Sequence, residues 1–440
     1  MTLGWHVSGV DGPIAADPTN NALWAMNKGA HTLDEVDATT GAVKHTYNVS
    51  LDGSQHFPTP EVNSNGTWVV TESGTHVVGV QVGSTSSTPT WTSPALDGFV
   101  QSRPVIANNV VVVATEGDSV YGLSLTTGAF VWTTTDATTS DHGQTLGTPE
   151  SQAQNNSLDS GAVNGCGDIW PLGITSNLVA APNGDVYAVG EVQTGTTTTS
   201  YPDFQVMAVN PATGAQTLTP TSIVPTSMKT APVQIEAEQQ RAGLFIGANS
   251  NVYVGFGGLS GDCGTYHGYE VVVSEAGSVV GDFESTAISN AGAIWATAGG
   301  AVDSGGTVYV STGNNTRGNP PSGTDYTDGV VAVPANISGE ITAPGNFFQP
   351  AEWKTDNDAD ADLGSAAPVL LPNGTQLFVI GKQHNAFLLN ASALGGFDHE
   401  TPVGRLNGAC SGESFGQNAA LGNSAYFNCT GTGMVQVVFS

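Results

Sequence analysis

The sequence predicts an all-β protein, a single domain in which eight four-stranded antiparallel sheets stand radially as the blades of a propeller. The stretch from Pro104 to Trp132 shows the repeating theme: apolar strand, acidic turn, alternating strand, Thr-Thr-Gly turn and a further strand. The turn glycines Gly41, Gly128 and Gly214 are spaced by 87 and 86 residues, so each spacing holds two units of about 43 residues, the length of one blade. The composition agrees, because 57 glycines, much Ser and Thr and few helical patterns favour strands joined by tight turns.

Taken in order, the units fill the chain, and the last of them needs both chain ends. We expect blades at about 12–49, 56–93, 100–135, 166–223, 234–287, 291–350, 362–395 and 408–440. The last unit has only three strands, and the isolated alternating strand around Trp5 is expected to supply the fourth. This closure would remove the exposed edge of an open sheet. A seven-bladed ring is the alternative.

Four insertions are expected within the single domain 1–440, at about 136–165, 190–203, 256–269 and 313–328. The first is polar and predicts a long surface loop or lid. The other three connect the second and third strands of blades four, five and six. In a propeller these connections share one face with the loops that enter the innermost strands. The mouth of the central channel on that face is therefore the expected site.

The charge balance restricts the partners and the environment. Nine Lys and Arg face 38 Asp and Glu, giving a net charge of −29, which excludes nucleic acid as a partner because phosphates require basic clusters. Only 11% of residues are charged, however, so the surface is mostly neutral and polar. Free carboxylates have pKa values of about 4, so in strong acid this protein would carry a modest positive charge. We expect a periplasmic or extracellular protein of an acidic environment; a secreted protein of a neutral-pH bacterium is the alternative.

The sequence contains no evident targeting or membrane-spanning segment. No apolar run of 18 residues occurs, so no membrane span is expected. The first residues, Met1 to His6, do not form a signal peptide, which indicates either a removed leader or a cytosolic protein. Export would favour two disulfides among the four cysteines, with Cys410–Cys429 as the expected pair because both lie in the last repeat. Free, buried thiols are the alternative.

Several residues are expected at the channel mouth. The starts of innermost strands place Arg103, Trp295 and Glu413 there, together with Asp168 and Trp170. The connections between second and third strands add Cys263, Asp325, Lys382 and His384. Each has a structural alternative: the tryptophans could pack between blades, and Arg103 and Glu413 could pair with neighbouring backbone.

Lys382 and His384 are two potential cations in one short turn of a chain that is poor in cations, a pattern typical of anion binding. A solvated hairpin tip is the alternative. The run Asp-Asn-Asp-Ala-Asp-Ala-Asp at 356–362 begins like a calcium loop, but Ala361 and Ala367 stand where that loop requires Gly and Glu. We interpret it as a polar connection that enters blade seven, and expect no metal site.

The repeated Thr-Gly turns, the segment GAIWATAGGAVDSGGTVYVSTGNN (292–315) and the segment at 362–396 resemble the pyrroloquinoline-quinone-type β-propeller superfamily. This superfamily contains quinone dehydrogenases, assembly scaffolds and hydrolases. Its dehydrogenases usually carry adjacent cysteines and a Glu/Asn/Asp calcium site, whereas no two cysteines are adjacent here. We therefore expect no cofactor, with pyrroloquinoline quinone (PQQ) and Ca²⁺ as the alternative.

A propeller of this type with an acid-adapted composition resembles the tetrathionate hydrolases of acidophilic sulfur oxidisers. That resemblance implies a homodimer that splits tetrathionate, a small inorganic sulfur anion, into thiosulfate, sulfate and sulfur. Asp325 is then expected to take the proton from water. Lys382, His384 and Arg103 would hold the sulfonate ends, with Trp295 and Glu413 as further binding residues, and Cys263 is the alternative nucleophile. A non-catalytic scaffold or binding propeller is the remaining alternative.

Overall fold

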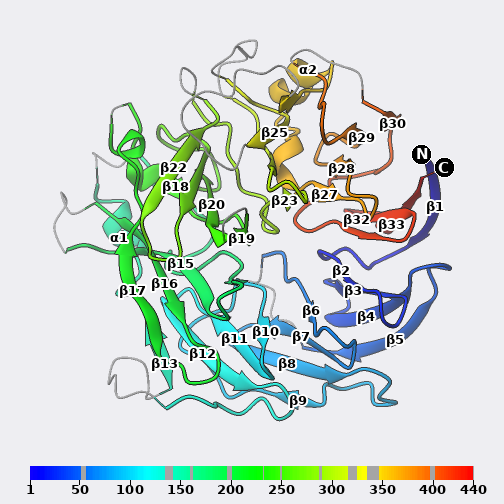
Figure 1. Cartoon of the computed structure of the whole chain (residues 1–440), viewed down its shortest axis with the longest axis horizontal. Coiled ribbons are helices and arrows are strands. Elements are labelled where there is room, and N and C mark those ends of the chain that lie inside the picture. The colour runs from blue at the N-terminus through cyan, green and yellow to red at the C-terminus, as the bar shows by residue number, and fades with distance from the viewer. Residues whose placement is uncertain are drawn as a thin grey trace.

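The chain forms a ring of eight blades, as expected (Figure 1). This computed structural model describes residues 1–50, 56–133, 142–158, 162–195, 201–230, 232–247, 250–286, 290–315, 325–333, 346–396 and 402–439. Each blade is an antiparallel sheet, and in seven of the eight the strands follow one another along the chain. The first strands of neighbouring blades contact one another, for example β2 (Ala15–Asp17) with β6 (Glu61–Val62), so these strands form the inner wall of the ring.

The blades lie close to the expected boundaries. Blade one comprises β2, β3 (Ala22–Asn27), β4 (Thr32–Asp37) and β5 (Val43–Asn48). Blade two comprises β6, β7 (Trp68–Ser73), β8 (His76–Gln81) and β9 (Trp91–Thr92). Blade three comprises β10 (Val105–Ala107), β11 (Val110–Ala114), β12 (Ser119–Ser124) and β13 (Gly143–Thr145). Blade four comprises β14 (Val179–Ala180), β15 (Val186–Val192), β16 (Asp203–Val209) and β17 (Gln216–Ser222).

The second half of the ring repeats this plan. Blade five comprises β18 (Glu238–Gln239), β19 (Phe245–Ile246), β20 (Val252–Gly258), β21 (Tyr269–Val273) and β22 (Val279–Glu284). Blade six comprises β23 (Ala301–Val302), β24 (Val308–Ser311), β25 (Val330–Val333) and β26 (Phe347–Phe348). Blade seven comprises β27 (Val369–Leu370), β28 (Gln376–Ile380), β29 (Ala386–Asn390) and β30 (Gly404–Leu406). Two short helices, α1 (Gln152–Asn155) and α2 (Trp353–Asp358), lie in connections.

Blade eight joins the two ends of the chain, which confirms the expected closure. It comprises β31 (Ala419–Leu421), β32 (Ser424–Cys429), β33 (Gly433–Val438) and β1 (Thr2–Val7). In the register of β1 and β33, Thr2 pairs with Val438 and Val7 with Met434. The strand around Trp5 therefore completes the last sheet, and the two termini lie side by side (Figure 1).

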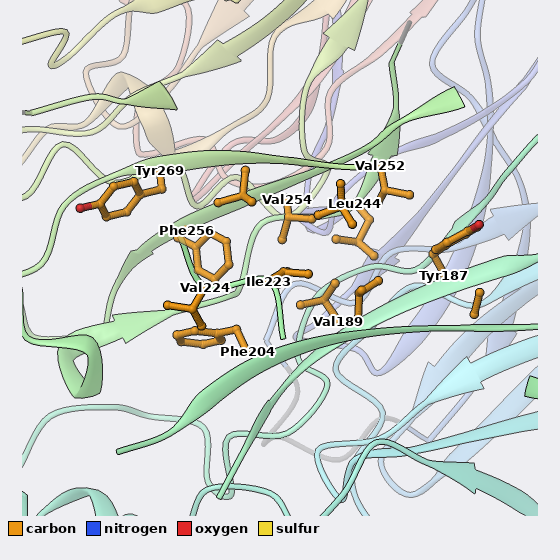
Figure 2. Close-up of a cluster of buried hydrophobic side chains, with 14 of the residues drawn as sticks. Tyr187, Val189, Phe204, Ile223, Val224, Leu244, Val252, Val254, Phe256 and Tyr269 are labelled. Carbon is orange, nitrogen blue, oxygen red and sulfur yellow. The ribbon is translucent and has the colours of Figure 1, made fainter. Parts of the chain in front are cut away.

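Apolar layers between facing blades form the core. Figure 2 shows the layer between blades four and five, where Val189 and Phe204 face Val254 and Phe256. All four side chains are fully buried, and the rings of Phe204 and Phe256 meet edge to face with centroids 5.0 Å apart. Alternating strands expose one row of side chains to each neighbouring blade, so the core is divided into layers that follow the ring.

The turn glycines that indicate the repeat are required for two separate reasons. Gly41, Gly128 and Gly214 have φ between +70° and +74°, which L side chains disfavour. Each also lies under a tryptophan of the preceding blade: a methyl group at Gly214 would come within 2.6 Å of the Trp132 indole. The Trp132 Nε1 donates a hydrogen bond to the Pro211 carbonyl at 2.8 Å, which fixes the ring over the turn. The Thr-Gly turn is therefore a docking point between blades.

The structure differs from the sequence expectations in four places. Gly128 and Gly214 lie in the neighbouring blades three and four, so their spacing of 86 residues holds one blade and the connection between them, not two units. Part of the stretch 136–165 is not a surface loop, because β13 adds to β12 by backbone pairing and Leu158 and Val163 are fully buried. The inner edge of blade five is split, since β18 and β19 pair with opposite ends of β20. The fourth strand of blade seven, β30, lies beyond the expected boundary at residue 395. Such short strands depend on backbone hydrogen bonds and therefore leave little apolar pattern in a sequence.

Candidate functional site

A cavity of about 410 Å³ opens at the face on which the sequence placed the site. Loops that enter innermost strands supply one part of its wall, with His56 and Phe57 from blade two, Asp168 from blade four, Trp295 from blade six, Asp360 and Asp362 from blade seven, and Glu413 and Phe415 from blade eight. Connections between second and third strands supply another part, with residues 258–262 and Tyr266 of blade five, Asn314 of blade six and Lys382 of blade seven. Six blades thus converge on one cavity, together with Arg241 of blade five.

Hydrogen bonds between blades that are not neighbours cross the channel. Arg103 of blade three donates from its guanidinium to the Gln417 side chain at 3.0 Å, beside blade eight. Asn177, in the loop that enters blade four, accepts from the Arg103 backbone N–H at 2.7 Å and donates from its own side chain to the Thr297 carbonyl, in the loop that enters blade six. Arg241 donates to the carbonyl of His56 at 2.8 Å, near blade two. These side chains tie the inner ends of distant blades together.

Lys382 occupies a polar corner of the cavity. Its ammonium lies 2.8 Å from the Asp362 carboxylate and 3.4 Å from that of Asp360, and it stands 5.7 Å from the centre of the Trp295 ring. Asp362 is buried and also accepts a hydrogen bond from the Asn314 N–H at 2.7 Å. Burial raises the pKa of Asp362, and the neighbouring ammonium opposes that effect. The ammonium is therefore paired with carboxylates only while these are ionised.

Arg241 is a second cation, which sequence reasoning missed. Its side chain is 6% exposed, and it donates to the carbonyls of Thr175, Gln101 and His56. Among the described residues, no carboxylate lies within 4.0 Å of its guanidinium. Burial lowers its pKa to about 10, and the charge of Asp168 opposes this shift. Arg241 therefore stays positively charged at neutral and acidic pH.

Aromatic side chains join the two charged ends of the cavity. Phe57 and Phe415 stack with centroids 5.3 Å apart, and Phe415 lies 6.3 Å from Trp295. Next to this row, His56 Nδ1 lies 3.6 Å from an Asp168 carboxylate oxygen. Burial lowers the pKa of His56, Asp168 acts in the opposite direction, and Arg241 and Lys28 add to the lowering.

The cavity gathers four of the residues expected at the mouth: Asp168, Trp295, Lys382 and Glu413. Two others lie elsewhere. Arg103 does not line the cavity, because it is committed to Gln417 and to Glu61, whose carboxylate is 3.5 Å away. His384 is exposed at the hairpin tip, where its ring contacts the Gly412 carbonyl at 2.5 Å. Lys382 and His384 point apart because the tip turns sharply, with φ of +66° at His384.

Asp325 and Cys263 also lie outside the lining of the cavity. Asp325 follows residues 316–324, which fall outside the described residues, and its side chain is fully buried where its backbone bridges to Thr286. Its catalytic role stays a prediction. Cys263 forms a disulfide with Cys166, with Cα atoms 6.0 Å apart, so it has no free thiol in this state. The second disulfide is the expected Cys410–Cys429 pair.

The run at 356–362 contributes more to the site than the sequence indicated. It includes the end of α2 and then the two carboxylates of Asp360 and Asp362 that hold Lys382. What could have indicated its role in the site is the position of this acidic run directly before an innermost strand, not its likeness to a calcium loop.

Among the described residues, no group of three or more His, Cys, Asp or Glu side chains is arranged to hold a metal ion. Within the same residues, no helix is long and apolar enough to cross a membrane.

Comparison with known proteins bears on the fold. No protein-family model and no curated protein matches the sequence significantly. The structure is similar to that of BamB from Moraxella catarrhalis, with a TM-score of 0.54 and 12% identity over 99% of this chain and 97% of that one. Hydrazine synthase from Kuenenia stuttgartiensis aligns with a TM-score of 0.47 and 12% identity over 99% and 98% of the two chains. At such identities the likeness shows the fold alone: this chain is an eight-bladed β-propeller similar to BamB.

Proposed function

We propose that this protein is an exported, acid-active hydrolase that cleaves tetrathionate with water at the channel mouth. One observation supports this most directly: Lys382 and Arg241, two of only nine Lys and Arg residues, line one cavity whose other charged groups are mostly carboxyls. At neutral pH the carboxylates Asp168, Asp262, Asp360, Asp362 and Glu413 would repel an anion. Burial raises the pKa of Asp362, so acid protonates this partner of Lys382 while both cations remain charged, and the cavity becomes more attractive to a small anion.

The reaction places definite demands on the cavity. One tetrathionate and one water give one thiosulfate, one sulfate, one sulfur atom and two protons, so a base must accept a proton from water and donors must stabilise the leaving thiosulfate. Lys382 and Arg241 are suited to stabilise the leaving thiosulfate. Asp325 is the candidate for the base that the sequence predicts. Asp168 is a second candidate, because its carboxylate lies on the wall of the cavity beside His56.

The decisive experiment is incubation of the purified protein with tetrathionate at pH 3, with release of thiosulfate as the readout. We expect turnover at pH 3 that declines toward pH 7. Absence of thiosulfate from the folded protein at every pH would refute the hydrolase proposal. Light scattering of the eluting protein would test the homodimer that the resemblance implies.

The alternatives are distinguished by other readouts. A quinone dehydrogenase would develop a chromophore when PQQ and Ca²⁺ are added. Trp170 or Trp295 would be the floor for the planar quinone, and the Lys382 ammonium lies 5.7 Å from the centre of the Trp295 ring. A scaffold propeller would show no turnover. The two disulfides are compatible with an exported protein.

A further inference from the structure

The cavity has two cationic ends that are built differently. The Arg241 guanidinium is held by carbonyls of residues 56, 101 and 175, on the side of blades two to four. The Lys382 ammonium lies over Trp295, on the side of blades six and seven. A run of contacts links the two ends: Arg241 donates to the His56 carbonyl, the ring of the next residue, Phe57, stacks on Phe415, and Phe415 lies 6.3 Å from Trp295. Both cations line one cavity of about 410 Å³ together with this aromatic row, and Lys28 Nζ stands 5.6 Å from the centre of its Phe57 ring.

Within the part of the chain that the structure describes, no carboxylate forms an ion pair with the Arg241 guanidinium. Carbonyl oxygens satisfy some of its N–H groups, but they do not neutralise its charge, and a buried cation without a paired anion is costly. Asp168 and Glu72 act on it only electrostatically. A guanidinium in this state, facing a cavity, is suited to bind an oxyanion through charge-assisted hydrogen bonds.

Lys382 has its counter-charges supplied by the protein. Asp362 and Asp360 pair with its ammonium, and Glu413 lines the same cavity from blade eight. These are the acidic groups that face it from the neighbouring elements. An external anion competes with them for the ammonium, and it competes best when they are protonated. Arg241 therefore offers a permanent anchor, and Lys382 offers one that acid makes available.

We propose that the cavity is a two-ended site for linear dianions, in which Arg241 binds one terminal oxyanion group and Lys382 the other, while the uncharged middle of the ligand lies against Phe415 and Trp295. This inference deepens the proposed function and rests on it for the natural substrate, tetrathionate. Recognition of both ends should make the cavity prefer linear dianions to monoanions of the same kind.

The test uses ligands that contain no sulfur–sulfur bond and stay ionised in acid. Ethane-1,2-disulfonate carries two terminal sulfonates, and ethanesulfonate carries one. Isothermal titration of the whole protein at pH 3 should show the disulfonate binding at least about tenfold more tightly, since the second end gains a charge-assisted hydrogen bond. Equal affinities for the two ligands would overturn the proposal.

Variants assign the two ends. Lys382→Gln should reduce the affinity for the disulfonate to that for the monosulfonate, whereas the control Lys354→Gln, at an exposed Lys–Asp pair, should change neither. Arg241→Gln should weaken both ligands about tenfold or more, and Arg241→Lys should restore part of the loss. If Arg241→Gln does not fold, as judged by circular dichroism, Lys382→Gln still decides: an unchanged preference for the disulfonate in that variant contradicts the two-ended site.

The two-ended binding site and the hydrolase function can be refuted independently of each other. A protein that prefers the disulfonate but releases no thiosulfate from tetrathionate retains the two-ended site and loses the hydrolase function. A protein that hydrolyses tetrathionate without that preference retains the function and loses the two-ended site.

Discussion

The ammonium of Lys382 lies 2.8 Å from the carboxylate of Asp362, so the cavity supplies one of its cations with an internal anion. Asp362 in turn accepts a hydrogen bond from the Asn314 N–H, which holds it in place. The pair connects the charge state of the cavity to pH, because protonation of Asp362 releases Lys382.

Asp362→Asn should therefore improve anion binding near neutral pH. At pH 6 the variant should bind ethane-1,2-disulfonate several-fold more tightly than the natural protein, since Lys382 loses a competing carboxylate. At pH 3 the two proteins should bind alike. The matched control is Asp358→Asn, which removes the partner of the exposed Lys354. An Asp362→Asn protein whose affinity matches the natural one at pH 6 would show that this carboxylate does not compete.

Stability should be highest in acid. Burial raises the pKa of Glu72 and of Glu150 from 4.5 to about 7. Below pH 4.5 both states hold these protons; between pH 4.5 and 7 the unfolded chain releases them while the folded protein keeps them. The free energy of unfolding thus falls as pH rises through this range, by about 3 kcal/mol for one such group.

Chemical denaturation at pH 4, 5.5 and 7 would measure this slope. The carboxyl group of Glu150 has no hydrogen-bond partner among the described residues, so Glu150→Gln should lessen the slope without removing a side-chain hydrogen bond. A flat profile, or an equal slope in Glu150→Gln, would contradict the assignment to this carboxyl.

The contact between the Trp132 indole and Gly214 should make Gly214→Ala more destabilising than a Gly→Ala change that strains the backbone alone. Gly214→Ala and Gly374→Ala both place a side chain at positive φ, +74° and +70°, but only Gly214 has a neighbour that the new methyl group would strike. We expect Gly374→Ala to cost about 1–2 kcal/mol, and Gly214→Ala about 1–3 kcal/mol more. Equal losses in thermal or chemical unfolding would show that the indole moves aside freely.

The Cys166–Cys263 disulfide should support the cavity as well as the fold. It joins the segment before blade four to the connection of blade five, whose residues 258–262 line the cavity. Replacing both cysteines by Ser should cost about 2–5 kcal/mol of stability and weaken disulfonate binding. Gly214→Ala is the control, because it loses stability far from the cavity and should keep its affinity. A double variant with unchanged affinity would limit the disulfide to a purely structural role.

The two candidates for the base can be separated by isosteric changes. Asp325→Asn should abolish thiosulfate release at pH 3 with the fold intact, if the sequence-derived role is right. Asp168→Asn is the comparison, because Asp168 lies on the cavity wall and Asp325 does not. Full turnover in Asp325→Asn and none in Asp168→Asn would place the base at Asp168.

The fold was accessible from the sequence because its signals are local and repeated. Thr-Gly turns, alternating strands and a three-stranded last unit predicted eight blades and their closure, which the structure confirms. Four residues expected on that face, Asp168, Trp295, Lys382 and Glu413, also converge in the cavity. Arg241 escaped notice because nothing near it in the sequence shows that its guanidinium reaches carbonyls of three other blades.

The turn at 382–384 shows a second limit. Two cations close in sequence were expected to act together, but the tip conformation sends His384 to the surface and Lys382 into the cavity. Likewise, the aspartates at 360 and 362 resembled a failed calcium loop, whereas their role depends on Lys382, some twenty residues later in the chain. Side-chain direction and long-range pairing are not encoded in local spacing.

The pairing of β1 with β33 has a consequence for how this molecule is made. The ribosome makes β1 before the other strands of the ring and β33 after them, so the ring stays open until β33 has been made. Closure therefore follows the synthesis of all eight blades, and until then the last sheet lacks the pairing between its third and fourth strands.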